Sequence, residues 1–221
     1  PMISVTFSII IVSVVISLMA FKDNHLMNKL IFYPPAVKSG EWYRLFTYGV
    51  LHADMTHLIF NMFTFYLFGT AVESACKLTL GTTAGTACFL LMYISSLLIS
   101  ILPTYIKQKE NRYYQSLGAS GAVSAIVFAY ILINPMNFMG IMFIPIMLPA
   151  FLFGIIFILI SVKLDQNQTG GINHSAHITG GIFGIAFIIV AFKIIANINL
   201  ALHFFSQIHI RSIGDLIHFG Y

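Results

Sequence analysis

Long apolar runs separated by short polar stretches make up most of this chain. Each run is about 20 residues long, and at about 1.5 Å per residue a helix of that length crosses the roughly 30 Å hydrocarbon core of a bilayer. We therefore predict six membrane-spanning helices, at Met2–Phe21, Met55–Ala75, Thr82–Leu102, Ser116–Ile133, Phe138–Val162 and His174–Phe192. Pro145 and Pro149 are expected to kink or loosen the fifth helix.

Two segments depart from this pattern. Residues Lys22–Ala53 are too many for a tight turn and too apolar for a free loop, and their aromatic side chains gather around Arg44 in GEWYRLFTYGVL, which predicts a segment in the membrane interface. The stretch IANINLALHFFSQIHI has the scattered polar positions of a surface helix. The sequence thus predicts an all-α bundle over residues 1–196, with a long interfacial first loop, and a surface-lying tail over residues 197–221.

Composition supports a polytopic membrane protein. Hydrophobic residues make up 58% of the chain and charged residues only 8%, a balance that soluble domains do not have. The net charge is +4, but the sequence has no basic block with interleaved aromatics, so a nucleic-acid partner is not expected and the positive charges are expected to meet lipid headgroups. Cys76 and Cys88 fall at or inside apolar segments, which favours buried thiols over a disulfide or metal site.

Unusual polar residues fall in the first turns of the second, fourth and sixth predicted helices. The second opens with His57 and Asn61, four residues apart and hence on one face; the fourth opens with Ser120; the sixth has His177 about one turn in. In a chain that crosses the membrane six times, these three helices begin on the same side. The four side chains are therefore expected to lie at a similar shallow depth.

This set of residue types suits nucleophilic catalysis. A serine hydroxyl needs a positioned base, for which histidine is the usual choice, and the oxyanion that forms needs hydrogen-bond donors. Asn61, His57 and the Ser120 backbone N–H can donate. Small residues would let the fourth and sixth helices approach closely; they include Gly118, Gly121, Gly180 and Gly184.

Each feature also has a structural interpretation. Glycine and serine between membrane helices usually serve packing, Asn61 alone would join helices, and His177 alone could bond a carbonyl; a transporter or channel would also place polar groups in the bilayer. Zinc could bind His52, His57, His174 and His177. However, the sequence lacks a His-Glu-x-x-His motif, and zinc would leave Asn61 and Ser120 without a role. The joint pattern favours catalysis.

Three short motifs of this sequence resemble those of one protein family. HLIFN (His57–Asn61), GASG (Gly118–Gly121) and AHITGGIFG (Ala176–Gly184), in that order after a long first loop, are similar to motifs of the rhomboid family of intramembrane serine proteases. The resemblance implies Ser120 as nucleophile, His177 as general base, and Asn61, His57 and the Ser120 amide as oxyanion donors. It also implies transmembrane protein substrates, cleaved within or near the bilayer, and no metal or organic cofactor.

Two positions depart from the family pattern. The Trp-Arg pair of the first loop is Tyr43-Arg44 here, with Trp42 one position earlier. Well-known bacterial members have an aromatic residue one turn after the nucleophile that packs on the histidine, and this chain has Ser124 there, which predicts an imidazole held less firmly. Neither change removes a reacting group, so an active enzyme is favoured over an inactive relative that binds membrane clients.

Two arguments about sidedness disagree. The side of the membrane that holds loops one, three and five carries eight basic residues and the other side three, so the positive-inside rule puts the first side, and the site, in the cytoplasm. The family resemblance implies cytoplasmic termini and a site that opens outward. We follow the resemblance, because half of those charges lie in the predicted interfacial loop. The compact core without a transit peptide favours a bacterial cytoplasmic membrane.

Overall fold

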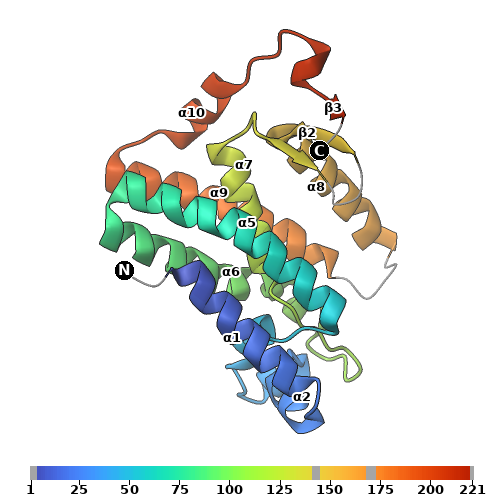
Figure 1. Ribbon diagram of the computed structural model, residues 1–221. Helices are drawn as coiled ribbons and strands as arrows, with labels where there is room; N and C mark the ends of the chain where they lie inside the picture. Colours follow the sequence, from blue (N-terminus) through green and yellow to red (C-terminus); the bar gives the residue numbers. More distant parts are fainter. Residues whose placement is uncertain (1–3, 141–144, 168–172, 220–221) are drawn as a thin grey trace.

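The computed structural model describes residues 4–140, 145–167 and 173–219 as a mostly helical bundle (Figure 1). Its long helices are α1 (Val5–Ala20), α5 (Met55–Leu80), α6 (Thr82–Gln108), α7 (Ser120–Ile133), α8 (Ala150–Asn167) and α9 (His174–Ala196). Helix α7 is central and contacts α5, α6, α8 and α9. Figure 1 shows the N-terminus at the end of the bundle where α5 turns into α6, and α2 at the opposite end.

Three of the described helices are long and apolar enough to cross a membrane: α5, α6 and α9. Helices α1 and α7 are apolar but have only 16 and 14 residues. Helix α7 is short because it begins inside the protein, and most of its side chains are buried by its neighbours. The protein is thus an integral membrane protein of mostly helical structure, and the count of six spans stays a prediction.

The start of the fourth predicted span is wrong by four residues. Helix α7 begins at Ser120, not at Ser116, because the backbone of Ser116 pairs with Phe32 through two hydrogen bonds of 3.0 and 3.1 Å. Gly118 then turns the chain with a φ of +114°, a conformation that residues with a side chain rarely adopt. The bend brings Ser120 to the start of a buried helix.

The fifth predicted span, Phe138–Val162, is not one helix. Strands β1 (Phe138–Gly140) and β2 (Ile146–Pro149) pair antiparallel, and α8 begins only after Pro149. Proline lacks an N–H and restricts the residue before it, so the helix cannot extend back across Pro145 and Pro149. The two prolines thus lie before the start of α8 and do not form a kink within it.

The tail after α9 folds back over the bundle. Helix α10 (Leu200–Gln207) is followed by the short helix η2 (Ile213–Asp215) and by strand β3 (His218–Phe219), which pairs antiparallel with β2 and completes a sheet in the order β1-β2-β3. The Gln207 side-chain amide donates to the Ile133 carbonyl oxygen at the end of α7 (3.1 Å). The purely helical prediction missed this small sheet.

The first loop is folded around Arg44. It contains α2 (Asn24–Leu30), α3 (Pro34–Lys38), α4 (Arg44–Thr47) and the 3-10 helix η1 (Tyr48–Val50). The buried Arg44 guanidinium donates to the carbonyl oxygens of Asn28 and Ile31 at 2.7 and 2.8 Å and pairs with Glu41. The neighbouring Trp42 is 69% exposed. The Arg44 guanidinium thus stabilises the loop from inside. The interfacial position of the outer aromatic side chains stays a prediction.

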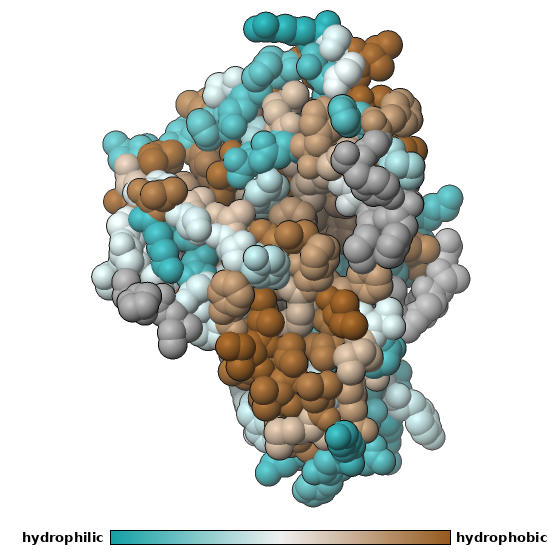
Figure 2. Space-filling view, in the orientation of Figure 1, coloured by the Kyte–Doolittle hydropathy of each residue, from teal (hydrophilic) through white to brown (hydrophobic). Residues whose placement is uncertain are grey.

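Helix α1 turns most of its polar side chains inward and many of its apolar side chains outward. Thr6, Ser13 and Ser17 are buried against the bundle, whereas Phe7, Ile11, Val12, Val15, Leu18 and Met19 are exposed. Figure 2 shows the resulting apolar band over α1, above a polar surface over α2. This polarity is the reverse of that of a helix on a soluble protein, and it fits a helix that faces lipid.

A buried carboxylate joins α1 to α5. Glu73 of α5 accepts hydrogen bonds from the backbone N–H groups of Val5 and Thr6 (3.0 and 2.9 Å) and from the hydroxyls of Ser4 and Thr6 (2.6 and 2.7 Å). Lys77, one turn along α5, forms an ion pair with it at 2.5 Å. The first N–H groups of a helix have no partner inside the helix, so Glu73 supplies the acceptor that α1 lacks.

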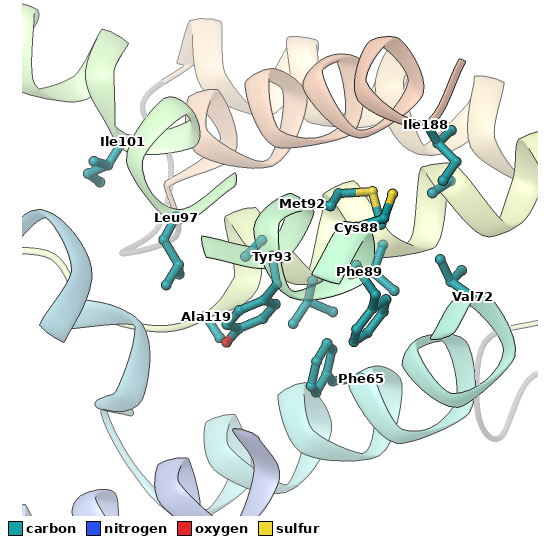
Figure 3. Packing of buried hydrophobic residues seen from close by; sticks show 14 of the residues in the cluster. Phe65, Val72, Cys88, Phe89, Met92, Tyr93, Leu97, Ile101, Ala119 and Ile188 are labelled. Carbon is teal, nitrogen blue, oxygen red and sulfur yellow. The ribbon is translucent and has the colours of Figure 1, made fainter. Parts of the chain in front are cut away.

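The apolar core lies mainly between α5, α6 and α7 (Figure 3). The Phe65 ring of α5 packs on Phe89 and Tyr93 of α6, with ring centroids 6.3 and 5.0 Å apart. The prediction that both cysteines are buried is confirmed, since Cys76 and Cys88 are free thiols within this cluster. This core holds α5, α6 and α7 together and extends to Ala119, directly before Ser120.

Candidate active site

Ser120 and His177 are in direct contact. Ser120 is the first residue of α7, and His177 lies in the first turn of α9. The Ser120 Oγ atom and the His177 Nε2 atom are 2.7 Å apart, which is hydrogen-bond distance. The two residues lie 57 positions apart in the sequence, so only the packing of α7 on α9 brings them together.

Glycines allow the two helices to approach this closely. A Cβ atom on Gly180 would overlap the Gly121 carbonyl oxygen, and one on Gly184 would overlap the Ala125 carbonyl oxygen. Gly121 in turn leaves room for Ser100 of α6, whose Cβ atom would be 2.7 Å from an added Cβ. Backbone therefore packs directly on backbone at Gly180 and Gly184, and a serine side chain of α6 packs on the backbone of Gly121.

Asn173 sets the point at which α9 begins. Its side-chain oxygen accepts from the Ala176 N–H (3.0 Å) and so caps the helix. The same side chain exchanges hydrogen bonds with the Thr104 hydroxyl of α6, at 3.1 and 2.9 Å. The cap therefore fixes the height of His177 relative to α6 as well as to its own helix.

His57 lies on the other side of Ser120, in the first turn of α5. The backbone N–H of Ala53 donates to its Nδ1 atom (3.3 Å), so the proton of the neutral ring is on Nε2. That Nε2 atom would be 3.1 Å from a Cβ atom on Gly118. Gly118 is thus required twice, for its positive φ and for the space that the imidazole occupies.

Asn61 lies one turn after His57 on the same face of α5 and is buried. Its side-chain NH₂ donates back to the His57 carbonyl oxygen at 3.3 Å. An amide NH₂ has two donors, so the second is free to serve another acceptor.

A cavity of about 990 Å³ connects these residues. Ser120, His177, His57 and Asn61 all line it, together with Gly118. The remaining wall is mostly apolar and comes from α5, α7, α8 and strand β1; it includes Phe60, Phe68, Val127, Phe128, Ile131 and Phe153. The four side chains singled out by the sequence thus share one cavity, with the polar groups collected in one part of it.

The His177 ring has an aromatic neighbour that the sequence did not indicate. Phe157 of α8 stacks on the imidazole, with ring centroids 6.3 Å apart and an angle of 28° between the planes. His174 contacts the imidazole edge-on at 5.8 Å. Ser124 lines the same cavity but carries no ring. The expectation of a loosely held imidazole stays a prediction, but the ring has an aromatic neighbour from α8 where α7 offers none.

The four histidines weighed as zinc ligands form two separate pairs. His52 and His57 lie edge to face at 5.1 Å between ring centroids, and His174 and His177 do so at 5.8 Å. Across residues 4–140, 145–167 and 173–219, no group of three or more His, Cys, Asp or Glu side chains has the geometry to hold a metal ion. The metal interpretation of this cluster therefore has no support in the side-chain arrangement.

His52, just before α5, is buried and neutral. The Ser17 hydroxyl donates to the Val50 carbonyl oxygen (2.9 Å), so its oxygen accepts from the His52 Nδ1–H at 3.0 Å. The Nε2 atom of His52 is buried without a hydrogen-bond partner among the described residues. Burial, with a smaller effect from the nearby His57, lowers the pKa of His52 to about 4.

Comparison with known proteins identifies the family. The model of the Rhomboid domain matches residues 39–194. This range includes the four cavity side chains that the sequence singled out: His57, Asn61, Ser120 and His177. The chain belongs to the rhomboid family. Its relatives include "Putative rhomboid protease YdcA" of Bacillus subtilis, which is 31% identical over 173 residues, covering 78% of this chain and 66% of that protein.

Two further relatives come from eukaryotes. "RHOMBOID-like protein 12, mitochondrial" of Arabidopsis thaliana is 29% identical over 170 residues, covering 72% of this chain and 49% of that protein. "Presenilin-associated rhomboid-like protein, mitochondrial" of Rattus norvegicus is 28% identical over 151 residues, covering 65% of this chain and 37% of that protein. The rhomboid chain described here thus spans less than two thirds of the length of each of these relatives.

Sequence reasoning missed two residues of the site. Asn173 could have been found, because an asparagine directly before an apolar helix is a common cap. Phe157 could not, because it is one of 21 phenylalanines and lies in the apolar first half of α8. Only the packing of α8 against α9 singles it out.

Proposed function

We propose that this rhomboid-family protein is an intramembrane serine endopeptidase with a Ser-His catalytic dyad. The 2.7 Å contact between Ser120 Oγ and His177 Nε2 carries the proposal. The Nε2 atom accepts the serine proton while Oγ attacks the carbonyl carbon of the scissile bond, and it then gives that proton to the leaving amine. A water molecule hydrolyses the acyl-enzyme by the same steps in reverse, and no metal or organic cofactor takes part.

Three donors stabilise the oxyanion in this proposal. The Ser120 N–H belongs to the first turn of α7, where backbone donors have no partner inside the helix. The Nε2–H of His57 and the second N–H of the Asn61 amide face the same cavity. Donors fixed before the reaction cost no reorganisation as the charge develops, which is the main source of rate in acyl transfer.

The substrates in this proposal are transmembrane segments of other proteins. The cavity has its polar groups at the starts of α5, α7 and α9, whereas its long wall is formed by phenylalanine, valine and isoleucine side chains. An apolar segment can lie on that wall while its scissile carbonyl reaches Ser120. The protein then lies in a bacterial cytoplasmic membrane, with lipid around the bundle and the site open to the outer side.

The experiment is to label the purified protein with a fluorophosphonate and to measure cleavage of a model transmembrane substrate. Ser120 is expected to be labelled. Ser120→Ala and His177→Ala are expected to abolish turnover with the fold intact, since residues that act as a unit fail together. Ser124→Ala is the matched control, because it removes a serine one turn along the same cavity wall, and it should keep both labelling and turnover.

Near wild-type turnover by Ser120→Ala would refute the dyad. Absence of labelling and cleavage in the wild type, with client binding retained, would show an inactive rhomboid-like protein instead. Solute flux sensitive to His57 and His177, without proteolysis, would show a transporter.

A further inference from the structure

The Nδ1 atom of His177 takes part in no hydrogen bond among the described residues; the one hydrogen bond of this ring joins Nε2 to the Ser120 hydroxyl. In catalytic triads a third residue binds Nδ1 and holds the ring in one orientation. A histidine side chain turns about two bonds, so a single contact to a small hydroxyl leaves the ring plane undetermined. Here, packing must determine it.

The Phe157 ring lies beside the imidazole. The two rings are nearly parallel, at 28°, with centroids 6.3 Å apart, within the 4.5–7 Å range of favourable ring pairs. Phe157 is itself held by Phe128 of α7, whose ring centroid is 6.0 Å away. Phe128 in turn fills the space beside Gly181, where an added Cβ would be 2.7 Å from its ring. The stack therefore runs from α7 through α8 to α9.

We infer that Phe157 is a positioning residue, which holds the His177 imidazole in the plane that points Nε2 at Ser120. This inference rests on the proposed function, because it assigns how the general base of that reaction is oriented. In this role Phe157 acts on the reaction through the histidine, with which its ring is paired.

The location of Phe157 has a further consequence. Ser120 and His177 lie on α7 and α9, whose backbones are in direct contact, whereas Phe157 lies on α8 and also lines the substrate cavity. A segment bound in that cavity contacts the wall that carries the ring. Orientation of the base therefore depends on how α8 packs, and through it on what occupies the cavity.

The test compares Phe157→Ala with Phe153→Ala. Phe153 is one turn earlier on α8 and lines the same cavity, but its ring is not among those that pack on His177. Phe157→Ala should lower kcat about ten- to hundredfold, because an ångström of misplacement costs about that much, with little change in KM. Phe153→Ala should alter KM and leave kcat within about threefold, whereas Phe157→Tyr keeps the ring and should keep kcat.

Rescue separates positioning from general loss of stability. Ser124 lies one turn after Ser120 and lines the same cavity as His177, so Ser124→Phe can supply a ring from α7 instead of α8. In the Phe157→Ala background it should restore most of the lost kcat. A Phe157→Ala protein that is folded and keeps kcat within threefold overturns the inference, as does a kcat loss that follows thermal stability and is not rescued.

A second readout needs no turnover. NMR of ¹⁵N-histidine-labelled Ser120→Ala protein should give one sharp set of His177 ring signals, which broadens or doubles on Phe157→Ala but not on Phe153→Ala. Unchanged His177 signals in both would overturn the positioning role. If wild type neither cleaves nor reacts with fluorophosphonate, the proposed function fails, while the NMR comparison still decides whether Phe157 orients His177.

Discussion

Gly180→Ala should disable the site without touching a reacting group. A Cβ atom at Gly180 would overlap the Gly121 carbonyl oxygen, which is backbone and cannot swing aside as a side chain can. Ordinary Cβ contacts lie at 3.4–4 Å, so α9 must retreat from α7 by roughly 1 Å or more to accept the methyl group, a shift typical of an overpacked core.

The size of the effect follows from that shift. The 2.7 Å contact between Ser120 and His177 would lengthen to about 3.7 Å, beyond the upper limit of about 3.2 Å for such a hydrogen bond. A 1 Å misplacement costs about 10²-fold in rate, so kcat should fall about a hundredfold. Overpacking costs about 1–3 kcal/mol of stability, partly offset by the better helix propensity of alanine, about 1 kcal/mol.

The assay is cleavage of a model transmembrane substrate, together with the rate of fluorophosphonate labelling and a thermal unfolding curve in detergent. Gly214→Ala controls for the added methyl group, because a Cβ there would meet only the Ser212 hydroxyl, at an ordinary 3.5 Å. A folded Gly180→Ala protein that cleaves within threefold of wild type would refute the claim that this backbone contact sets the geometry of the dyad.

Three further outcomes are expected. Asn61→Ala should lower kcat by up to about 10²–10³-fold, the loss typical of one oxyanion donor, with a smaller change in KM; an effect confined to KM would rule that role out. The neutral buried His52, with a pKa of about 4, should make stability fall as pH drops from about 6.5 to 4, by up to about 1.4 kcal/mol per unit, because only the unfolded histidine gains a proton there. Thermal unfolding of His52→Gln should show a shallower slope over this pH range than that of the wild type, and an unchanged slope would contradict the assignment. With both native cysteines replaced, Lys109→Cys should react with an impermeant maleimide in intact cells and Lys193→Cys only after lysis; the reverse would mean that the charge rule gives the topology.

The sequence was most informative where chemistry and periodicity coincide. The order of the motifs that contain Ser120 and His177 predicted that α5, α7 and α9 begin at one end of the bundle, and the structure brings those residues to one cavity. Hydropathy located the long helices α5, α6 and α9 to within a few residues at their starts. These features depend on local pattern, which a sequence records directly.

Hydropathy failed where an apolar segment does something other than form a helix. The segment that begins at Phe138 is as apolar as a membrane span. Its two prolines lack the backbone N–H that a continuous helix needs, and part of the segment forms the paired strands β1 and β2 instead. Helix α7 is shorter than its apolar run because the backbone of Ser116 is paired with Phe32, 84 residues earlier. The role of Phe157 likewise depends on which of many phenylalanines meets one histidine. Such pairings are long-range and leave no local trace.

The carboxylate of Glu73 also bears on how the protein is made. Helix α1 is synthesised before α5, but the acceptor for its leading N–H groups lies 67 and 68 residues later, on α5. Until that part of the chain leaves the ribosome and enters the bilayer, those N–H groups and the Thr6 hydroxyl lack the acceptor that they have in the folded protein, a costly state in hydrocarbon. We therefore expect α1 to be fully stabilised in the bilayer only after α5 has been inserted, so a nascent chain that stalls before Glu73 should hold α1 less firmly.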